Sequence, residues 1–244
     1  MKLLQLNIEG DAHLPLVSNF IALENPEVLC IQEVFKRDIP IISGLPHVTF
    51  LPMLLERRSD GFLDERGIAL MSSHVQEDTV LHYYYKPTDD LKEQDRTSQE
   101  TKRKTIQHGV ISATIGGVRI ATLHHTWTQD GDKPSEYQKA DTRAFMEYIK
   151  TVPPVVVCGD FNIPRGHSTC YEMLTEYFED CVPLTYASSM HIPLHRVRTN
   201  PAVAAEVEKY MVDYIFRTPG AASVGNVVMK CGMSDHCALV AEIG

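Results

Sequence analysis

Short apolar runs that end in polar residues recur along the chain and predict buried β-strands. The central example is residues 155–163, where four apolar positions precede Gly159, Asp160 and Asn162. Four apolar residues, three of them β-branched valines, are too few for a helix and suit a buried strand. Because side chains alternate along a strand, Asp160 and Asn162 face the same way if the extended backbone continues. Taken alone, the stretch is more typical of a strand that ends in an Asp/Asn turn.

The same pattern occurs along the whole chain. It predicts further strands at residues 2–8, 28–31, 67–72, 82–85, 110–115, 118–123, 211–216 and 237–243. Polar residues that can bind a metal ion or transfer a proton stand at or near the ends of these strands and of the central one: Asn7, Glu33, His124, Asp160, Asn162, Asp213, Asp235 and His236. Singly, each is typical of an exposed or ion-paired residue, and their repeated position indicates a common site.

Two glycines at 116–117 separate two of these strands and predict a tight hairpin. In the register that this turn sets, Gly109 faces His124, and the absent side chain leaves space beside the imidazole. His125 follows directly. We expect one of the two histidines to be structural, at the surface or at a cap.

Apolar residues at helical spacing predict three helices between the strands. One covers residues 15–23, and one covers residues 137–148 after the capping pattern Ser135-x-x-Gln138. A third opens at Thr169. Strand, helix and strand within the first residues form a βαβ-like unit and favour an α/β fold.

Polar stretches at residues 52–67, 86–104 and 182–201 predict loops. The second is expected to be long and mobile, because it has no apolar period. Arg103 and Lys104 near its end are interpreted as a solvated charge run, with contact to a phosphate as the alternative.

Composition limits the class of protein. The chain has 244 residues and a formal net charge of −9, which fits one domain over residues 1–244 and lacks the strongly basic character of many nucleic-acid binders. Neither a signal peptide nor an apolar stretch of about 18 residues is evident, so we expect a cytoplasmic protein without a membrane span. The six cysteines form no Cys-x-x-Cys pair and are interpreted as reduced, mostly buried thiols.

Seven short segments, in order along the chain, resemble the endonuclease/exonuclease/phosphatase superfamily of deoxyribonuclease I-like, metal-dependent phosphodiesterases. They are Leu-Asn-Ile-Glu-Gly (6–10), Ile-Gln-Glu-Val (31–34), Gly-Ile-Ala-Leu-Met-Ser (67–72), Thr-Leu-His (122–124), Gly-Asp-Phe-Asn (159–162), Val-Asp-Tyr-Ile (212–215) and Ser-Asp-His (234–236). The resemblance implies a four-layer α/β (α+β) sandwich of two packed, mostly antiparallel sheets with helices outside.

The resemblance also implies a Mg²⁺ site, for which Mn²⁺ is a possible substitute. Glu33 is expected to be the main ligand, with Asn7 and Asp235 assisting directly or through water, since hard divalent cations prefer oxygen ligands. Glu9 stands where related proteins that process DNA often have Asp, and its longer side chain is expected either to shift the metal ion or to lie outside its direct ligands.

By the same resemblance, Asp160 positions or deprotonates the attacking water and Asn162 holds that water and a phosphate oxygen. His236 contacts the phosphate or acts as base, and Asp213 orients it and keeps it cationic. His124 is expected to stabilise the transition state or to protonate the leaving group. The division of the general-base role between Asp160, His236 and a metal-bound hydroxide stays open, as does one metal ion or two.

The leading hypothesis is therefore a Mg²⁺-dependent phosphodiester hydrolase with nucleic acid as substrate. The first alternative keeps the fold and takes a phospholipid head group or an inositol phosphate, because the basic and aromatic insertions that grip a DNA duplex are not evident. A non-catalytic binding protein is the last alternative. No protein partner is indicated.

Overall fold

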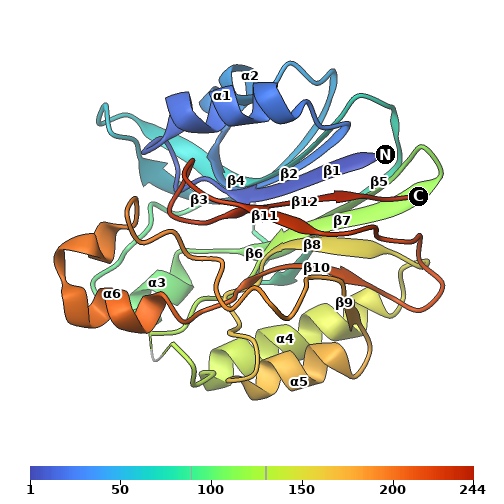
Figure 1. Ribbon diagram of the computed structural model, residues 1–244. Helices are drawn as coiled ribbons and strands as arrows, with labels where there is room; N and C mark the ends of the chain where they lie inside the picture. Colours follow the sequence, from blue (N-terminus) through green and yellow to red (C-terminus); the bar gives the residue numbers. More distant parts are fainter. Residues whose placement is uncertain (89, 130) are drawn as a thin grey trace.

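The computed structural model describes residues 1–88, 90–129 and 131–244. Within those residues, two six-stranded sheets stack face to face and helices cover the outer side of each (Figure 1). This four-layer α/β sandwich confirms the predicted fold class. Each sheet contains one parallel pair of neighbouring strands, and its other neighbours are antiparallel, as expected.

The strands divide between the two sheets as follows. The first sheet contains β1 (Lys2–Asn7), β2 (Val28–Phe35), β3 (His47–Arg57), β4 (Leu63–Ser72), β11 (Val228–Lys230) and β12 (Ala238–Glu242) in the order β11-β12-β1-β2-β4-β3. The second contains β5 (Gln76–Tyr85), β6 (His108–Ile115), β7 (Val118–His124), β8 (Val156–Asp160), β9 (Glu179–Asp180) and β10 (Asp213–Arg217) in the order β5-β6-β7-β8-β10-β9. The parallel pairs are β1 with β2 and β7 with β8.

The helices form the outer layers and one end of the molecule. The first sheet is covered by α1 (Leu14–Glu24) and α2 (Ile39–Ile42), and the second by α4 (Glu136–Ile149) and α5 (Thr169–Thr175) (Figure 1). Two further helices, α3 (Gln99–Lys104) and α6 (Pro201–Val207), lie at the left-hand end in Figure 1. Short 3₁₀ turns are η1 (Lys36–Asp38) and η2 (Arg196–Thr199). Across the described residues, no helix has the length and apolar character needed to cross a bilayer.

Strand β1 shows why the polar residues come to lie inside. Leu4 and Leu6 pack on one side with Val17 and Ile21 of α1 in the outer core. The opposite side, with Gln5 and the end residue Asn7, faces the other sheet and is fully buried too. A strand in the middle layers of a four-layer sandwich is buried on both faces. The polar residues that alternate along β1 therefore face the other sheet.

Two predicted loops contain regular structure. Residues 52–67 form most of the β3–β4 hairpin, where exposed charges pair across the surface, as in Lys36–Glu65 at 2.8 Å and Arg57–Glu93 at 2.9 Å. The loop predicted at 182–201 contains η2 and leads directly into α6, whose cap Asn200 accepts a hydrogen bond from Val203 N. Backbone hydrogen bonds between strands and helix capping form these elements. Their side chains are mostly polar, so no apolar periodicity in the sequence indicates them.

The stretch 86–104 is also partly ordered into a helix, although Asp89 lies outside the described residues. A Ser98–Thr101 capping box starts α3. Arg103 forms two hydrogen bonds with the buried Asp141, at 2.5 and 2.8 Å, so it is neither solvated nor free for a phosphate. Lys104 pairs with Glu100 at the surface, as a solvated charge run would.

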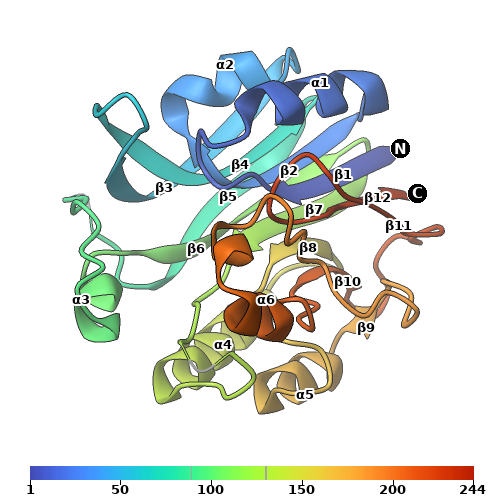
Figure 2. The same cartoon turned by 60° about the vertical axis from the view of Figure 1, so that its left-hand side comes forward.

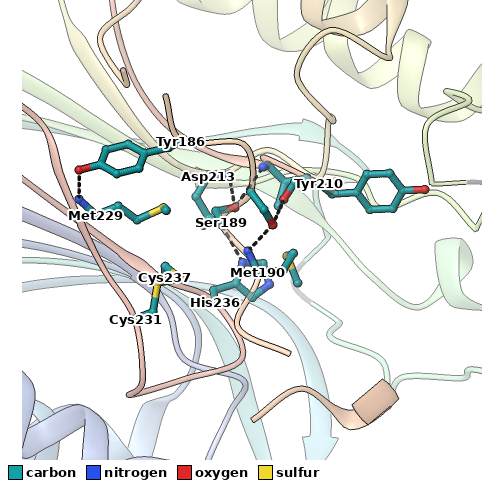
Figure 3. Close-up of a disulfide and its surroundings, with 11 residues drawn as sticks. Tyr186, Ser189, Met190, Tyr210, Asp213, Met229, Cys231, His236 and Cys237 are labelled. Atoms are coloured by element: carbon teal, nitrogen blue, oxygen red, sulfur yellow. Dashed lines mark hydrogen bonds and ion pairs between the residues drawn. A yellow bond between two sulfur atoms is a disulfide. The ribbon is translucent and has the colours of Figure 1, made fainter. Parts of the chain in front are cut away.

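The expectation of six reduced thiols is wrong for one pair. Cys231 and Cys237 form a disulfide, with their Cα atoms 4.2 Å apart (Figure 3). Their separation of six residues closes a tight loop that sequence spacing alone did not identify. Cys30, Cys158 and Cys170 are free and buried, as expected.

Candidate functional site

The two parallel strand pairs bring the predicted site residues together. In a parallel pair the carboxyl ends lie at the same edge, so β1 with β2 and β7 with β8 deliver Asn7, Glu33, His124 and Asp160 to one end of the sandwich. Strand β10 runs antiparallel to β8, and its first residue, Asp213, therefore pairs with Asp160, the last residue of β8. The loop before β12 reaches the same end, because β12 runs antiparallel to β1.

A cavity of about 770 Å³ opens at this end, and residues of α3 and α6 line it. The two helices lie apart from each other (Figure 2). Seven of the nine residues predicted from the sequence line it: Glu9, Glu33, His124, Asp160, Asn162, Asp235 and His236. The other two, Asn7 and Asp213, are buried directly behind the lining and bond to it. The residues therefore gather at one cavity between the two sheets.

Asp160 is the most connected of these groups. Its Oδ2 accepts a hydrogen bond from Asn7 Nδ2 at 2.9 Å, and its Oδ1 accepts one from the Asn162 backbone N at 2.8 Å. His124 Nε2 and His236 Nε2 lie 3.5 and 3.9 Å from the same Oδ2. Burial raises the pKa of Asp160 to about 7, with His236 opposing and Asp213 reinforcing this change. The carboxyl group therefore titrates near neutrality.

His236 is held by a carboxylate on its far side. Its Nδ1 donates to Asp213 Oδ2 at 2.7 Å, and the pair lies close to the disulfide (Figure 3). Burial alone lowers the pKa of His236, but the carboxylates of Asp213, Asp160 and Asp235 outweigh it and raise that pKa well above its usual value. The raised pKa favours the cationic imidazole, which is the state that the resemblance implies for His236.

The loop carrying Asp235 and His236 is fastened at several points. The disulfide closes it between residues 231 and 237, Cys237 N donates to Ser189 O at 2.7 Å, and His191 N donates to Asp235 O at 2.6 Å (Figure 3). Ser189 Oγ in turn accepts from the backbone N of Asp213 at 3.2 Å. Asp213 and His236 are thus fixed by one shared set of contacts.

Glu33 stands at an irregularity in β2. The register with β4 shifts between Gln32 and Val34, and Glu33 has a left-handed φ of 61°. Such bulges redirect a side chain at the cost of local strain. The carboxylate pairs with Arg66 and lies 3.5 Å from His124 Nε2.

Two more cavity residues have left-handed backbones. Asn162 has a φ of 52° and Glu9 a φ of 54°. At Asn162 the extended backbone, on which the expected common direction of the Asp160 and Asn162 side chains depended, does not continue. Instead they form a turn, and Asn162 Nδ2 donates to the backbone oxygen of His125 at 3.0 Å. Strain concentrated around a cavity is typical of functional sites.

The neighbouring histidines have different environments. His124 lines the cavity, between the carboxylates of Glu33 and Asp160. Gly109 leaves it no space, because a Cβ there would meet the His82 backbone oxygen at 2.7 Å and Leu51 Cδ2 at 2.7 Å. The glycine permits close strand and core packing, contrary to the prediction.

His125 is the structural member of the pair. Thr142 Oγ1 donates to Gln138 O at 2.7 Å, so it accepts from His125 Nε2 at 3.0 Å. His125 Nδ1 is then left to accept from the Tyr84 hydroxyl at 2.8 Å. Each ring nitrogen has a partner that suits the neutral tautomer.

We expect His108 and His125 to make the protein sensitive to acid. Burial lowers the pKa of His125 to about 3 and that of His108 to about 4. The unfolded chain binds these protons near pH 6.5 and the folded chain only far below it, so stability is complete above that pH and falls on acidification. Each of the two histidines should therefore lower the free energy of unfolding by about 2 kcal/mol as the pH falls from about 7 to about 5.

Urea unfolding at the two pH values measures the loss. His125→Gln should reduce the difference between them, whereas His74→Gln, at a histidine with 55% of its side chain exposed, should not. Equal pH dependence in the wild type and in His125→Gln would contradict the assignment.

Sequence reasoning did not identify a buried polar network behind the site. Gln5 Nε2 donates to Asp213 Oδ1 and to Gln32 Oε1, both at 2.9 Å, and Gln32 Nε2 donates to Thr122 Oγ1 at 3.0 Å. The network crosses from the first sheet to the second. The only sequence signal was a glutamine within an otherwise apolar strand, which is equally typical of a solvent-facing position.

Arg66 was also not identified, because the sequence places it in a loop. It lies on β4, pairs with Glu33 and Glu56, and is stacked over Phe35 at 6.0 Å. Its position directly before the Gly67 strand motif was the available signal.

The donors around the cavity fit a divalent cation. In the described part of the chain, one group of His and acidic residues has ligand atoms all within 4.8 Å: Asp160, Asp213 and His236. Asp213 already accepts from Gln5 and His236, so it orients its neighbours and is a poor direct ligand. Glu33 and Asp235 add further oxygen donors at the same cavity, and carboxylate oxygens are the ligands that hard divalent cations prefer.

Comparison with known proteins identifies the family. The model of the Endonuclease/Exonuclease/phosphatase family matches residues 4–236. No curated protein matches the chain in sequence.

Three solved structures illustrate the agreement in fold. An endonuclease/exonuclease/phosphatase from Bacteroides vulgatus has a TM-score of 0.69 and 17% identity, with 100% of this chain and 98% of that chain covered. A 3'-5' exonuclease from Neisseria meningitidis has a TM-score of 0.66 and 20% identity, with coverage of 100% and 99%. A mannosyl-6-phosphatase from Bacteroides thetaiotaomicron has a TM-score of 0.63 and 11% identity, with coverage of 100% and 99%.

Two of these proteins are named for different activities, a 3'-5' exonuclease and a mannosyl-6-phosphatase, so the likeness identifies the fold and leaves the substrate open. The family model extends over nearly the entire chain, from the strand that carries Asn7 to the loop that carries His236. Members of the family hydrolyse phosphate esters. The chain belongs to the Endonuclease/Exonuclease/phosphatase family and is a phosphoester-hydrolysing enzyme.

Proposed function

We propose that this protein is a Mg²⁺-dependent phosphodiester hydrolase that acts on nucleic acid, as one domain over residues 1–244. The observation that supports this most is the arrangement around Asp160. A buried carboxylate is oriented by Asn7 and flanked by His124 and by His236, whose far side is held by Asp213. Hydrolysis of a phosphodiester needs a positioned water, a base and cationic groups near the phosphate, and these residues supply them.

Glu33 and Asp235, assisted by Asn7, are the residues that we assign to hold the metal ion, and Mn²⁺ should substitute for Mg²⁺. When bound, the ion polarises the phosphate and offsets its negative charge. Glu9 pairs with His13 at 3.2 Å and its backbone N donates to Asn7 Oδ1 at 3.2 Å, so we assign it to orienting Asn7.

The protein's own groups divide the remaining work. Asp160, with a pKa near 7, accepts the proton of the attacking water. His236, cationic because of Asp213, donates to a phosphate oxygen. Burial lowers the pKa of His124 well below its usual value, so we assign its neutral ring to donate a hydrogen bond to the leaving oxygen. Asn162 fixes the turn after Asp160.

A smaller phosphate ester is the second candidate substrate, including a phospholipid head group or an inositol phosphate. The net charge of −9 and the bounded cavity of about 770 Å³ favour it, since both oppose binding of a duplex to an open basic surface. The mannosyl-6-phosphatase among the structures of the same fold is named for such a substrate.

Removal of the metal ion tests the proposal. Hydrolysis of bis(p-nitrophenyl) phosphate is expected with Mg²⁺ or Mn²⁺, and EDTA should abolish it until excess Mg²⁺ restores it. Undiminished hydrolysis in EDTA would exclude a metal-dependent mechanism. A panel of oligonucleotide, plasmid and abasic DNA, sphingomyelin and inositol phosphates then separates the substrates, and preference for either of the last two would replace nucleic acid.

A further inference from the structure

Six basic side chains of the described residues line the cavity, and two of them form no ion pair with a described acidic residue. Among the six, Arg57 pairs with Glu93, Arg66 with Glu33 and Glu56, Arg96 with Glu56, and Arg103 with Asp141. The other two, Lys102 of α3 and Arg196 of η2, form no ion pair with any residue that the structure describes. An unpaired cation inside a cavity is available to an anionic ligand.

Lys102 is placed beside an aromatic ring. Its Nζ lies 4.1 Å from the centre of the Trp127 ring, and Trp127 lines the same cavity with 40% of its surface exposed. An exposed indole within a cavity offers a face on which a nucleobase can stack. A cation and a stacking surface side by side match the two parts of a nucleotide, its phosphate and its base.

The positive charge at this position is concentrated. Burial lowers the pKa of Lys102 to about 8, and the neighbouring cations Arg96, Arg196 and Arg66 lower it further in the same direction. Like charges held close together are stabilised by an anion placed among them. A phosphate at this position would relieve their repulsion.

A chain of contacts connects this position with the hydrolytic centre. From Asp160 it passes to His124 at 3.5 Å, then from His124 to Glu33 at 3.5 Å, on to Arg66 and Glu56, and finally to Arg96 at 2.5 Å. Lys102 and Arg196 both act electrostatically on Glu56 at the far end of this chain. Lys102 also acts electrostatically on His124, and Arg196 on Glu9, so the two cations lie beside the hydrolytic centre. Because the ion pairs of Asp160 with described residues are with His124 and His236, we assign Lys102 and Arg196 to the phosphate next to the one that is cleaved.

We propose that Lys102, Arg196 and Trp127 form a second nucleotide subsite, which binds the phosphate and base adjacent to the cleaved phosphodiester of a single-stranded substrate. This inference rests on the proposed function and specifies its substrate. Residues of α3 and η2 line the cavity that contains the subsite, and the protein as a whole is acidic, so a flexible single strand fits it better than a duplex.

Three dinucleotides test the phosphate contact: TpT, which has only the internal phosphodiester, and pTpT and TpTp, which carry one more phosphate at the 5' or the 3' end. The wild type should cleave one of the latter two with a kcat/KM at least about tenfold above that of TpT, as a charge-assisted contact implies. Lys102→Met, which keeps the apolar stem, and Arg196→Gln should each bring this ratio near one. Hydrolysis of bis(p-nitrophenyl) phosphate should stay unchanged in both.

Matched controls come from the same short elements. Lys104→Gln on α3 and Arg198→Gln on η2 remove exposed positive charges that do not line the cavity, and both should keep the wild-type ratio. Equal cleavage of all three dinucleotides by the wild type, or an unchanged ratio in Lys102→Met and Arg196→Gln, would overturn the subsite.

Binding can be measured without catalysis, because Trp127 is the only tryptophan of the chain. Quenching of its fluorescence by the preferred dinucleotide in EDTA should give a Kd that rises about tenfold in Lys102→Met. For the base contact, Trp127→Phe should retain most of the dinucleotide kcat/KM, whereas Trp127→Ala should lose about tenfold. If no diester is hydrolysed, the proposed function fails, and the quenching titration still decides the subsite: quenching by TpT equal to that by pTpT and TpTp would exclude it.

Discussion

Replacement of Asp160 with Asn is expected to lower kcat for a phosphodiester by about 10³-fold or more. The change removes the base and keeps the shape, and general-base groups contribute about 10²–10⁴-fold. The amide keeps one acceptor oxygen, which can accept from Asn7 Nδ2 while the hydrogen bond from the Asn162 backbone N is lost, so the site keeps its overall shape. The loss should therefore appear in kcat at saturating substrate, with a smaller change in KM.

The same substitution is expected to stabilise the metal-free protein above about pH 7. Burial raises the pKa of Asp160 to about 7, so the folded state holds a proton that the unfolded state releases near pH 3.8. Stability from this group is complete at low pH and falls as the pH rises between these values, by up to about 4 kcal/mol. Asp160→Asn removes that loss. Thermal unfolding in EDTA at pH 8 should show a higher Tm for the variant.

Asp141 provides the matched control. It is a buried carboxylate on α4, in the helix layer that covers the sheet of Asp160, and its pKa is lowered where that of Asp160 is raised. Burial acts to raise the pKa of Asp141, but hydrogen bonds from Arg103 and Thr126 outweigh it and lower that pKa. Asp141→Asn should therefore lose stability at pH 8 and keep most of the activity. Near-normal kcat in Asp160→Asn would exclude the carboxylate as the base.

The second large effect is expected at Asp213, which does not line the cavity. Asp213→Asn should lower kcat by about 10²-fold or more, because His236 then loses the carboxylate that keeps it charged and oriented. His236→Ala should lose at least as much. Combining the two changes should add little, since both act through one imidazolium.

The pH dependence of activity shows whether Asp213 sets the charge of His236 or only packs against it. The pKa of His236 is raised well above 6.5, so wild-type activity should persist through neutral pH and fall only when this imidazolium loses its proton on the alkaline side. In Asp213→Asn that alkaline limb should move to lower pH. The pair also stabilises the fold below the unfolded-state pKa of His, and this contribution disappears as the pH rises through the folded-state pKa.

The pH–rate profile and NMR titration of the His236 ring measure both shifts. His74→Gln at the surface should change neither. An alkaline limb that stays in place in Asp213→Asn would show that Asp213 does not set the charge of His236.

The sequence by itself determined the chemical types and their order along the chain. The strands that carry Asn7, Glu33, His124, Asp160 and Asp213 at or near one end are evident from apolar runs, because the burial of a strand leaves a period in its own residues. The four-layer sandwich was implied by the resemblance of the seven segments to the family, and the two sheets confirm it. Most of the residues expected at the site line one cavity.

Tertiary structure alone decided how each group is used. Local pattern could not tell His124 from His125, and only the resemblance assigned a role to His124. In the fold, the His124 ring lies beside Asp160, whereas the His125 ring contacts Thr142 and Tyr84. Sequence could not show that Gln5 supports Asp213 from the opposite sheet, since the two are 208 residues apart.

For the same reason, the sequence alone did not identify the disulfide between Cys231 and Cys237 or the two cavity cations Lys102 and Arg196. Whether a cysteine is oxidised, or a lysine has an acidic partner, depends on which distant side chain the fold places within a few ångströms. Local pattern records what a residue's own backbone requires, whereas charge, tautomer and partner are set by contacts between strands and loops that are far apart in the chain.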